Sequence, residues 1–232
     1  DSSVGGKTGV DLPHGKNLVG AFHHPLLVAI DPLALETLPA RQLRCGLAEM
    51  LKHGIIADPA LFTRLQAGPP WDWVELIERA VAVKVAIVEE DPTEQGRRAV
   101  LNLGHTAGHA LESLSGYRLP HGEAVAMGLR VAAGIAVELR LCQPGLPAAV
   151  DAALLALGLP REWEGPHTPA DVVAAMGADK KRRLGRLRWV LPRAIGAVEV
   201  VDDVPAEAVL RALAGTRRAA GEHTRRDAAW TK

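Results

Sequence analysis

Residues 121–142 set the first limit on the fold, because alanine, valine and leucine recur on nearly every side of the helix they would form. A helix that is apolar all round is stable only where other elements cover most of its surface. The segment also carries Glu123, Arg130 and Glu138, which excludes a bilayer-spanning role. The sequence therefore predicts a central buried helix in a mainly α protein.

Similar patterns place the other elements around this helix. Helical periodicity predicts helices over residues 39–57, 71–90, 97–115, 146–157, 169–177 and 205–214. Short apolar runs predict strands at 26–30, 187–191 and 197–201, the first of them buried. Residues 1–25 have no sustained period and indicate a loop, whereas the basic residues 215–232 indicate a disordered tail.

Charge and cysteine content exclude several classes of protein. The 232 residues include 27 Lys and Arg and 27 Asp and Glu, so the formal net charge is zero. A balanced chain gives no reason to expect nucleic acid or a membrane surface as a partner. Two cysteines exclude a disulfide scaffold, and no signal peptide pattern opens the chain. We expect a cytoplasmic protein.

A polar stripe runs along the helix predicted over 97–115. Its members follow at steps of four, three, four and three residues: Arg98, Asn102, His105, His109 and Glu112. A solvated face is one interpretation. However, the stripe lacks Lys–Glu alternation and is interleaved with Gly104 and Gly108, each of which costs a helix about 1 kcal/mol relative to Ala. The pattern favours a binding or catalytic site.

The histidines of this stripe could bind a metal ion. His105 and His109 stand at i and i+4, a spacing that lets two imidazoles share one ion. His121 opens the next helix after a proline, and Glu49 is the natural oxygen ligand. Two His and one Glu with an open position are typical of catalytic zinc. The alternative for Glu49 is a surface ion pair with Lys52 at i+3.

Several cations stand apart from one another on this neutral chain. Lys84 interrupts an apolar stripe, so it either extends to water or reaches an anion in a cleft. Lys7, Lys16 and the pair Lys180 and Lys181 lie in glycine-rich or turn contexts. Such cations suit a substrate with phosphate or carboxylate groups.

Five short motifs follow one another along the chain: residues 1–10 (DSSVGGKTGV), 15–17 (GKN), 46–49 (GLAE), 102–106 (NLGHT) and 121–123 (HGE). In order and spacing they resemble the 3-dehydroquinate synthase family, a branch of the sugar-phosphate cyclases. The resemblance runs from residue 1 to about residue 204.

The resemblance implies the helical C-terminal domain of a two-domain fold, α/β followed by α, with a few short strands. Residues 1–38 would be a remnant and hinge of the N-terminal NAD-binding domain, and 39–214 the metal- and substrate-binding domain. Most of the NAD-binding domain would be absent, since no glycine-rich fingerprint follows a strand. The family also implies a homodimer.

The implied activity is that of a phosphate-eliminating lyase of the shikimate pathway, which leads to aromatic amino acids. Its small-molecule substrate would be a sugar phosphate, 3-deoxy-D-arabino-heptulosonate 7-phosphate, and its products 3-dehydroquinate and phosphate. The reaction combines oxidation by NAD, phosphate elimination, reduction and aldol cyclisation, with zinc or cobalt as divalent metal. The activity of a chain without most of the NAD domain stays open.

Site residues follow from the motifs by resemblance. The metal ligands would be Glu49, His105 and His121, which makes His109 a base beside the metal instead of a ligand. The catalytic residues would be His109, Glu94 and Lys52. Substrate would contact Asp1, Lys7, Asn17, Lys84, Arg98, Asn102 and one of the pair Lys180 and Lys181, with Lys180 favoured. NAD would lie against Lys16, Ala34, Leu35, Glu36 and Thr37.

Three alternatives remain. The chain could be another cyclase, of the valiolone or inosose type, although Asn102 and His109 favour 3-dehydroquinate synthase. Iron-dependent alcohol dehydrogenases share the two-domain frame but would need more His ligands and would not need Lys7, Lys84 and Arg98 together. A non-catalytic remnant is the third, and the intact set of metal ligands argues against it.

Overall fold

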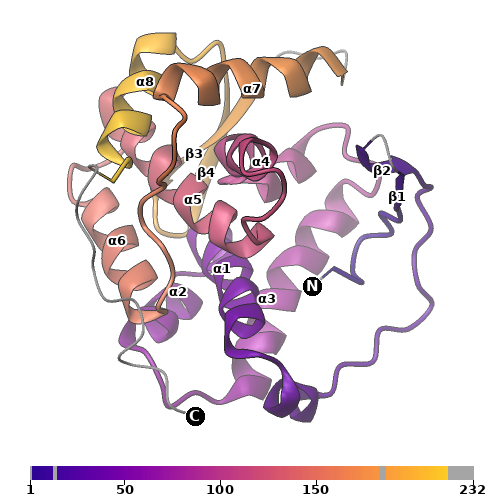
Figure 1. The fold of residues 1–232 in the computed structure, drawn as a ribbon. Coiled ribbons are helices and arrows are strands. Elements are labelled where there is room, and N and C mark those ends of the chain that lie inside the picture. Colours follow the sequence, from indigo (N-terminus) through magenta and orange to yellow (C-terminus); the bar gives the residue numbers. More distant parts are fainter. Residues whose placement is uncertain (1, 13–14, 183–186, 219–232) are drawn as a thin grey trace.

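The computed structural model describes residues 2–12, 15–182 and 187–218, and its centre is the helix α5 (His121–Glu138). Figure 1 shows α5 surrounded by other helices. It packs against α1 (Ala40–Ala57), α4 (His105–Leu114), α6 (Leu146–Ala156) and α8 (Ala206–Gly215). Most of its residues are buried, so the predicted central helix of a mainly helical domain is confirmed.

A second group of helices lies beside α1. It comprises the short helix η1 (Pro32–Thr37), α2 (Pro59–Ala67) and α3 (Trp73–Glu90). Asp58 and Asp72 begin α2 and α3, because each carboxylate accepts hydrogen bonds from backbone N–H groups of the first turn. The predicted helix over 71–90 is thus observed with a start at Trp73, whereas α2 was not predicted.

Two small antiparallel sheets complete the fold with α7 (Pro169–Arg182). The hairpin of β3 (Arg188–Ala194) and β4 (Ala197–Asp202) agrees with the two predicted strands and packs on α5 and α1. The hairpin of β1 (Val10–Leu12) and β2 (Gly15–Val19) lies where a loop was predicted.

The predicted single helix over 97–115 is wrong. Residues Arg97–Asn102 form a short 3-10 helix, η2, and α4 begins only at His105. Gly104 separates the two with a φ of +78°, a conformation that favours glycine. A Cβ there would lie 3.0 Å from the Val125 carbonyl oxygen of α5, so the close approach of α5 favours glycine at this position directly before α4.

The predicted buried strand at 26–30 is also wrong. No strand pairs with this segment among the described residues, and the side chains of Leu26 and Leu27 are largely exposed. Figure 1 shows the chain between β2 and η1 as an extended trace on the outside of the molecule. The apolar run suggested burial, but of its five residues only Val28 is partly buried.

Described residues beyond 214 still pack against the rest of the domain. Gly215 is the last residue of α8 and the Thr216 side chain is buried. Arg218 donates its backbone N–H to the carbonyl of Trp163. The rest of the tail expected from residue 215 lies outside the described residues.

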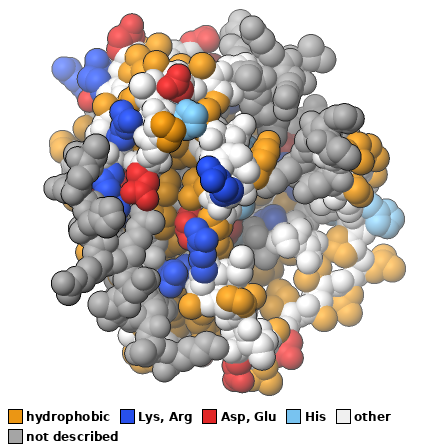
Figure 2. Space-filling view, in the orientation of Figure 1, with side chains coloured by type: hydrophobic (Ala, Val, Ile, Leu, Met, Phe, Trp, Pro, Cys, Tyr) orange, Lys and Arg blue, Asp and Glu red, His pale blue; other side chains and the backbone are white. Residues whose placement is uncertain are grey.

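The surface mixes charges of both signs. On the face shown in Figure 2, basic and acidic side chains are interspersed with apolar ones, in keeping with the balanced composition. Within the described part of the chain, no helix is both long and apolar enough to cross a membrane.

Candidate metal and substrate site

The starts of α4 and α5 meet the middle of α1 at the candidate site. Arg41 near the start of α1 donates to both carboxylate oxygens of Glu123 in the first turn of α5, at 2.6 and 2.9 Å. Gly108 of α4 packs closely on α5, because a Cβ there would lie 3.1 Å from the Ala124 carbonyl oxygen. These two contacts fix α1 and α4 against the beginning of α5, where His121 stands.

Glu49, His105 and His121 converge from α1, α4 and α5. The Glu49 Oε1 atom lies 3.3 Å from Nε2 of His121 and 3.7 Å from Nε2 of His105. One ligand atom from each residue falls within 4.8 Å of the other two. The three residues that the resemblance assigned to the metal are therefore close enough to share one ion.

The ring orientation of both histidines suits a metal ion. Nδ1 of His105 lies 3.0 Å from the Leu103 carbonyl oxygen, and Nδ1 of His121 lies 3.0 Å from Oε2 of Glu112. An Nδ1–H that donates to these oxygens leaves the Nε2 lone pair for a metal. Oε1 of Glu49, between the two Nε2 atoms, is buried and accepts no hydrogen bond from the described residues. The donor set fits a divalent ion such as zinc.

Electrostatics keep the carboxylate charged. Burial raises the pKa of Glu49, but Lys52, His121 and His105 together lower it well below its ordinary value. Glu49 is therefore available as an anionic ligand at neutral pH.

The pKa values of His105 and His121 are shifted in opposite directions. Burial and then Lys52 lower the pKa of His105 to about 3, so its imidazole is neutral. The carboxylates of Glu112 and Glu49, on either side of the ring, raise the pKa of His121 to about 9. Metal binding would therefore displace a proton from His121 at neutral pH.

Lys52 forms the ion pair with Glu49 that was the alternative interpretation. Its Nζ lies 2.6 Å from Oε2 of Glu49. However, Lys52 is only 4% exposed, so the pair is buried instead of lying on the surface. The pair uses Oε2, and Oε1 still faces the histidines.

His109 lies beside the cluster formed by Glu49, His105 and His121. Its ring centroid is 5.3 Å from that of His105 and 5.8 Å from that of His121. With Glu112 and His121 it forms a second group of possible ligands within 4.8 Å. The structure thus brings His109 next to the candidate metal site.

Several cations gather near the cluster. Burial and the charge of Lys52 lower the pKa of Lys84 to about 8, with further lowering by Arg98 and Lys7. Such mutual influence means that these cations, distant in sequence, lie close together. They form an electropositive region next to Glu49, which suits an anionic ligand.

Glu94 lies within this region in a strained conformation. Its carboxylate pairs with Lys7 and accepts a hydrogen bond of 3.0 Å from the side-chain amide of Asn102. Its φ of +60° is unusual for a residue with a side chain, and such conformations cluster at functional sites.

Arg98 is buried, and its guanidinium faces backbone oxygens. It is 2% exposed, and it donates to the carbonyls of Pro92 and Gly5, each at 2.6 Å. In this structure Arg98 therefore holds the glycine turn before Lys7 in place.

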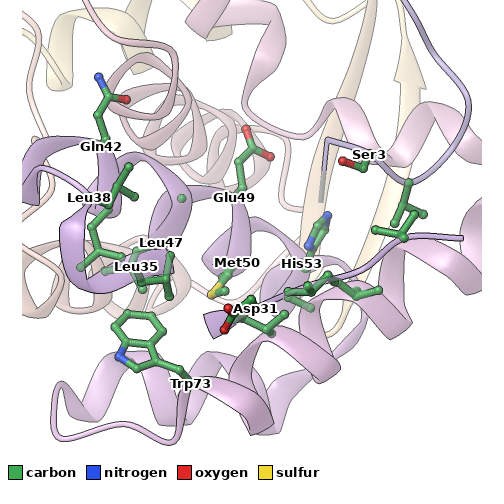
Figure 3. A pocket seen from close by; sticks show the side chains of 18 of the residues that line it. Ser3, Asp31, Leu35, Leu38, Gln42, Leu47, Glu49, Met50, His53 and Trp73 are labelled. Carbon is green, nitrogen blue, oxygen red and sulfur yellow. The ribbon is translucent and has the colours of Figure 1, made fainter. Parts of the chain in front are cut away.

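A cavity of about 400 Å³ adjoins the cluster. Figure 3 shows Glu49 and His53 of α1 at its edge, with Leu35 of η1 and Trp73 of α3 across from them. Of the four residues 34–37 expected to contact NAD, Leu35 lines this cavity.

The sequence did not assign a role to His53 or Glu112. His53 is fully buried, and burial followed by Lys52 lowers its pKa to about 3. Its spacing of one helical turn from Glu49 was the available signal. Glu112 was noted only as a member of the polar stripe.

Some predicted site residues cannot be placed. Asp1 lies outside the described residues, as do the side chains of Lys16, Asn17 and Lys180.

Two known families match consecutive parts of the chain. Residues 46–182 match the family described as "3-dehydroquinate synthase C-terminal", and residues 1–45 match "3-dehydroquinate synthase N-terminal". The chain is 46% identical over 225 residues to a 3-dehydroquinate synthase of Nostoc punctiforme, covering 93% of this chain and 62% of the relative. A 3-dehydroquinate synthase of Xanthomonas axonopodis pv. citri is 48% identical over 228 residues, again covering 93% and 62%. The chain thus spans about three-fifths of the length of these curated relatives.

Solved structures with the same fold belong to related enzymes. A 2-epi-5-epi-valiolone synthase from Streptomyces hygroscopicus, with NAD+ and Zn2+ bound, superimposes with a TM-score of 0.84 at 31% identity. The match covers 93% of this chain and 62% of that one. A 2-deoxy-scyllo-inosose synthase with carbaglucose-6-phosphate, NAD+ and Co2+ gives 0.75 at 24% identity, over 91% and 63%. The second likeness supports the fold alone.

Proposed function

The chain belongs to the 3-dehydroquinate synthase family, and on that premise we propose that it forms the metal- and substrate-binding part of a 3-dehydroquinate synthase. The substrate would be 3-deoxy-D-arabino-heptulosonate 7-phosphate, and the products 3-dehydroquinate and phosphate. The observation that supports this best is the convergence of Glu49, His105 and His121 beside a group of lysines.

Zinc would be held by Oε1 of Glu49 and by Nε2 of His105 and His121. When bound, the metal supplies Lewis-acid polarisation of substrate oxygens, and NAD supplies reversible hydride transfer. Cobalt has ligand preferences close enough to those of zinc to occupy the same donor set.

The lysines would hold the anionic groups of the substrate. Lys7, Lys52 and Lys84 are near enough to one another to lower the pKa of Lys84, so a bound phosphate or carboxylate would relieve their repulsion. Each fixed contact restricts the substrate to fewer orientations, and such positioning favours a reaction of several steps on one flexible intermediate.

Polar groups near the metal site would handle protons. The His109 ring centroid lies 5.3 Å from that of His105 and 5.8 Å from that of His121. This position suits a base that acts on a substrate held at the metal. Glu94 is oriented by Asn102 and Lys7, so its carboxylate could exchange a proton while it stays fixed. Asn102 would contribute to substrate binding next to Glu94. Arg98 would contribute by holding the turn that precedes Lys7.

NAD would use the cavity beside Glu49. The cavity is lined mainly by apolar side chains, with Ser3, Asp31 and His53 among the polar ones, as is usual for cofactor sites. A ring of NAD placed there would lie next to Glu49, which would hold the metal ion. Lys16 and residues Ala34, Glu36 and Thr37 would extend the contact from Leu35.

Phosphate release from 3-deoxy-D-arabino-heptulosonate 7-phosphate tests the proposal. The 232-residue chain is incubated with zinc and NAD, and His109→Ala serves as the inactive control. Release that requires NAD and fails in the control supports the assignment. If zinc binds but no phosphate appears, a family N-terminal domain is added in trans, because the chain spans only about three-fifths of its relatives.

No release in the presence of that domain would favour one of the alternatives. A valiolone- or inosose-type cyclase would release phosphate from a different sugar phosphate, whereas a non-catalytic remnant would release none from any. The homodimer and the cytoplasmic location stay predictions of the sequence.

A further inference from the structure

Glu112 is a buried carboxylate directly behind the candidate metal site. Its side chain is 6% exposed, and Oε2 lies 3.0 Å from Nδ1 of His121. The other buried residues of α4 are alanine, glycine and leucine. Burying a carboxylate costs several kcal/mol unless hydrogen bonds or charges compensate it, so the acidic residue at this position calls for a specific partner.

His121 is held between two carboxylates. Nε2 faces Oε1 of Glu49 at 3.3 Å, while Nδ1 faces Glu112 from the opposite edge of the ring. An Nδ1–H that donates to Glu112 fixes both the plane of the imidazole and its tautomer. It thereby directs the Nε2 lone pair toward the place where Glu49 and His105 converge.

His121 needs such a support more than the other two residues do. Its side chain is 45% exposed, compared with 14% for His105 and 17% for Glu49. As the first residue of α5, it also has no preceding helical turn to restrict its rotamers. His105, in contrast, is surrounded by protein and donates to the backbone of Leu103.

We propose that Glu112 is a positioning residue that orients His121 for binding of a divalent metal ion. The inference rests on the metal site proposed above. On this view, α4 contributes to the site twice, because His105 at its start is a ligand and Glu112 two turns later orients the ligand on α5.

A different role for Glu112 is possible on geometric grounds. His109, Glu112 and His121 form a second group whose ligand atoms lie within 4.8 Å of one another. If Glu112 bound an ion directly, the chain would hold two ions and His121 would bridge them. The stoichiometry of bound zinc distinguishes this role from the one proposed.

The test measures zinc binding to the full 232-residue chain by competition with a chromophoric chelator. Glu112→Gln should still bind one zinc, but roughly 10- to 100-fold more weakly, as for other carboxylates that orient a histidine ligand. Glu112→Asp keeps the carboxylate but places it farther from His121, so it should lose less zinc affinity than Glu112→Gln. The control is Glu138→Gln, which removes a carboxylate bonded to Arg211 near the other end of α5 and should bind zinc as the unaltered chain does.

The visible spectrum of the cobalt-loaded chain gives a second measurement. A change in the orientation of His121 should shift the cobalt bands of Glu112→Gln but not those of Glu138→Gln. Thermal unfolding of the metal-free variants shows whether Glu112→Gln still folds. If it does not fold, the zinc affinity and cobalt spectrum of Glu112→Asp are compared with those of the unaltered chain instead.

Three results would overturn the inference. Unchanged zinc affinity and an unchanged cobalt spectrum in a folded Glu112→Gln would show that Glu112 does not orient the ligand. Two zinc ions in the unaltered chain and one in Glu112→Gln would make Glu112 a ligand instead. If the unaltered chain bound no zinc, the proposed metal site would fail, and this inference with it.

Discussion

Gly122 of α5 lies directly on the backbone of Cys45 in α1. A Cβ on Gly122 would stand 2.3 Å from the Cα of Cys45 and 2.5 Å from its carbonyl oxygen, distances that real side chains do not adopt. Gly122 follows His121, and Cys45 precedes Glu49 by one helical turn. The contact therefore sets the separation between the helix that carries the carboxylate and the helix that carries the second histidine.

Gly122→Ala should destabilise the fold and weaken zinc binding together. The added methyl group meets backbone atoms that cannot move aside, and overpacking of this kind costs about 1–3 kcal/mol. The displacement of α5 from α1 would also separate His121 from Glu49. Chemical denaturation and chelator competition measure the two effects.

Gly46→Ala is the matched control for that experiment. It adds the same methyl group to α1, where no described residue lies within 4 Å, so the better helix propensity of alanine should stabilise the chain by up to about 1 kcal/mol. An equal loss of stability in both variants would refute the argument from the Gly122 contact.

His105→Ala and His109→Ala should separate metal binding from turnover. His105→Ala removes one of three ligands, so bound zinc should fall from one ion per chain to almost none. His109→Ala should keep the zinc and lose phosphate release. Metal analysis and the phosphate assay check both variants. If His109→Ala lost the zinc, the division of roles between the two histidines would be wrong.

The sequence predicted the core helices better than the breaks between them. The apolar pattern that continues around α5 requires burial on all sides, and the structure provides it. The break at Gly104 was missed because periodicity describes one helix at a time. The reason for it lies in the neighbouring helix, whose Val125 carbonyl leaves no room for a side chain.

Short-range signals for the missed elements were present. Asp58 followed by Pro59 is typical of a helix start, since the carboxylate caps the first turn and proline suits its first position. The run at 26–30 was misleading for the opposite reason. Its apolar residues predict a covered strand, but the described chain covers only Val28, and that only in part.

For the site, spacing alone was an uncertain guide. The i, i+4 pattern joined His105 to His109, whereas the structure places His105 and His121 around Glu49. The sequence offered His121 as a candidate because it opens a helix after a proline, but no local pattern predicts which helix N-terminus will meet α4, so its assignment to the metal came from the family resemblance. Likewise, the orientation of His121 by Glu112 depends on how α4 and α5 pack.

Anion binding should weaken as the pH rises, because Lys84 loses its charge. With a pKa of about 8, Lys84 is protonated at pH 7 and largely neutral at pH 9, and only the charged form attracts an anion. Sulfate is a suitable probe, since its own charge is constant over this range. Titration calorimetry on the metal-free chain, to which this pKa applies, should show sulfate affinity falling as the pH passes through about 8.

Two variants test the assignment to Lys84. Lys84→Met should bind sulfate about tenfold more weakly at pH 7, which is the usual loss for one charged hydrogen bond. Lys84→Arg should bind with little dependence on pH, because a guanidinium stays protonated. If the affinity of Lys84→Arg fell with pH as steeply as that of the unaltered chain, another group would be responsible.

Asp58 should make stability depend on pH in the acidic range. Its carboxylate caps α2 through the N–H groups of Ala60 and Leu61, and it accepts a 2.7 Å hydrogen bond from Arg79 of α3. Burial raises the pKa of Asp58, but Arg79 and the backbone donors lower it below the ordinary value of 3.8. The unfolded chain therefore binds the proton at a higher pH than the folded chain does.

The sign follows from that order. The stabilising contribution is fully present above pH 3.8 and is lost as the pH falls through the lower folded value. Asp58→Asn keeps a capping side chain but removes the charge opposite Arg79, so it should cost about 0.5–1 kcal/mol at pH 7. The difference from the unaltered chain should shrink as the pH is lowered below 3.8.

Asp72→Asn is the comparison that isolates the ion pair. Asp72 caps α3 through Val74 and Glu75 in the same way as Asp58 caps α2. Asparagine caps helices about as well as aspartate does, so this variant should change the free energy of unfolding by only a few tenths of a kcal/mol. Denaturant unfolding of both variants at pH 7 and pH 3 decides the matter. Equal losses at pH 7 would assign the effect of Asp58 to its cap, and the contact with Arg79 would then contribute nothing measurable.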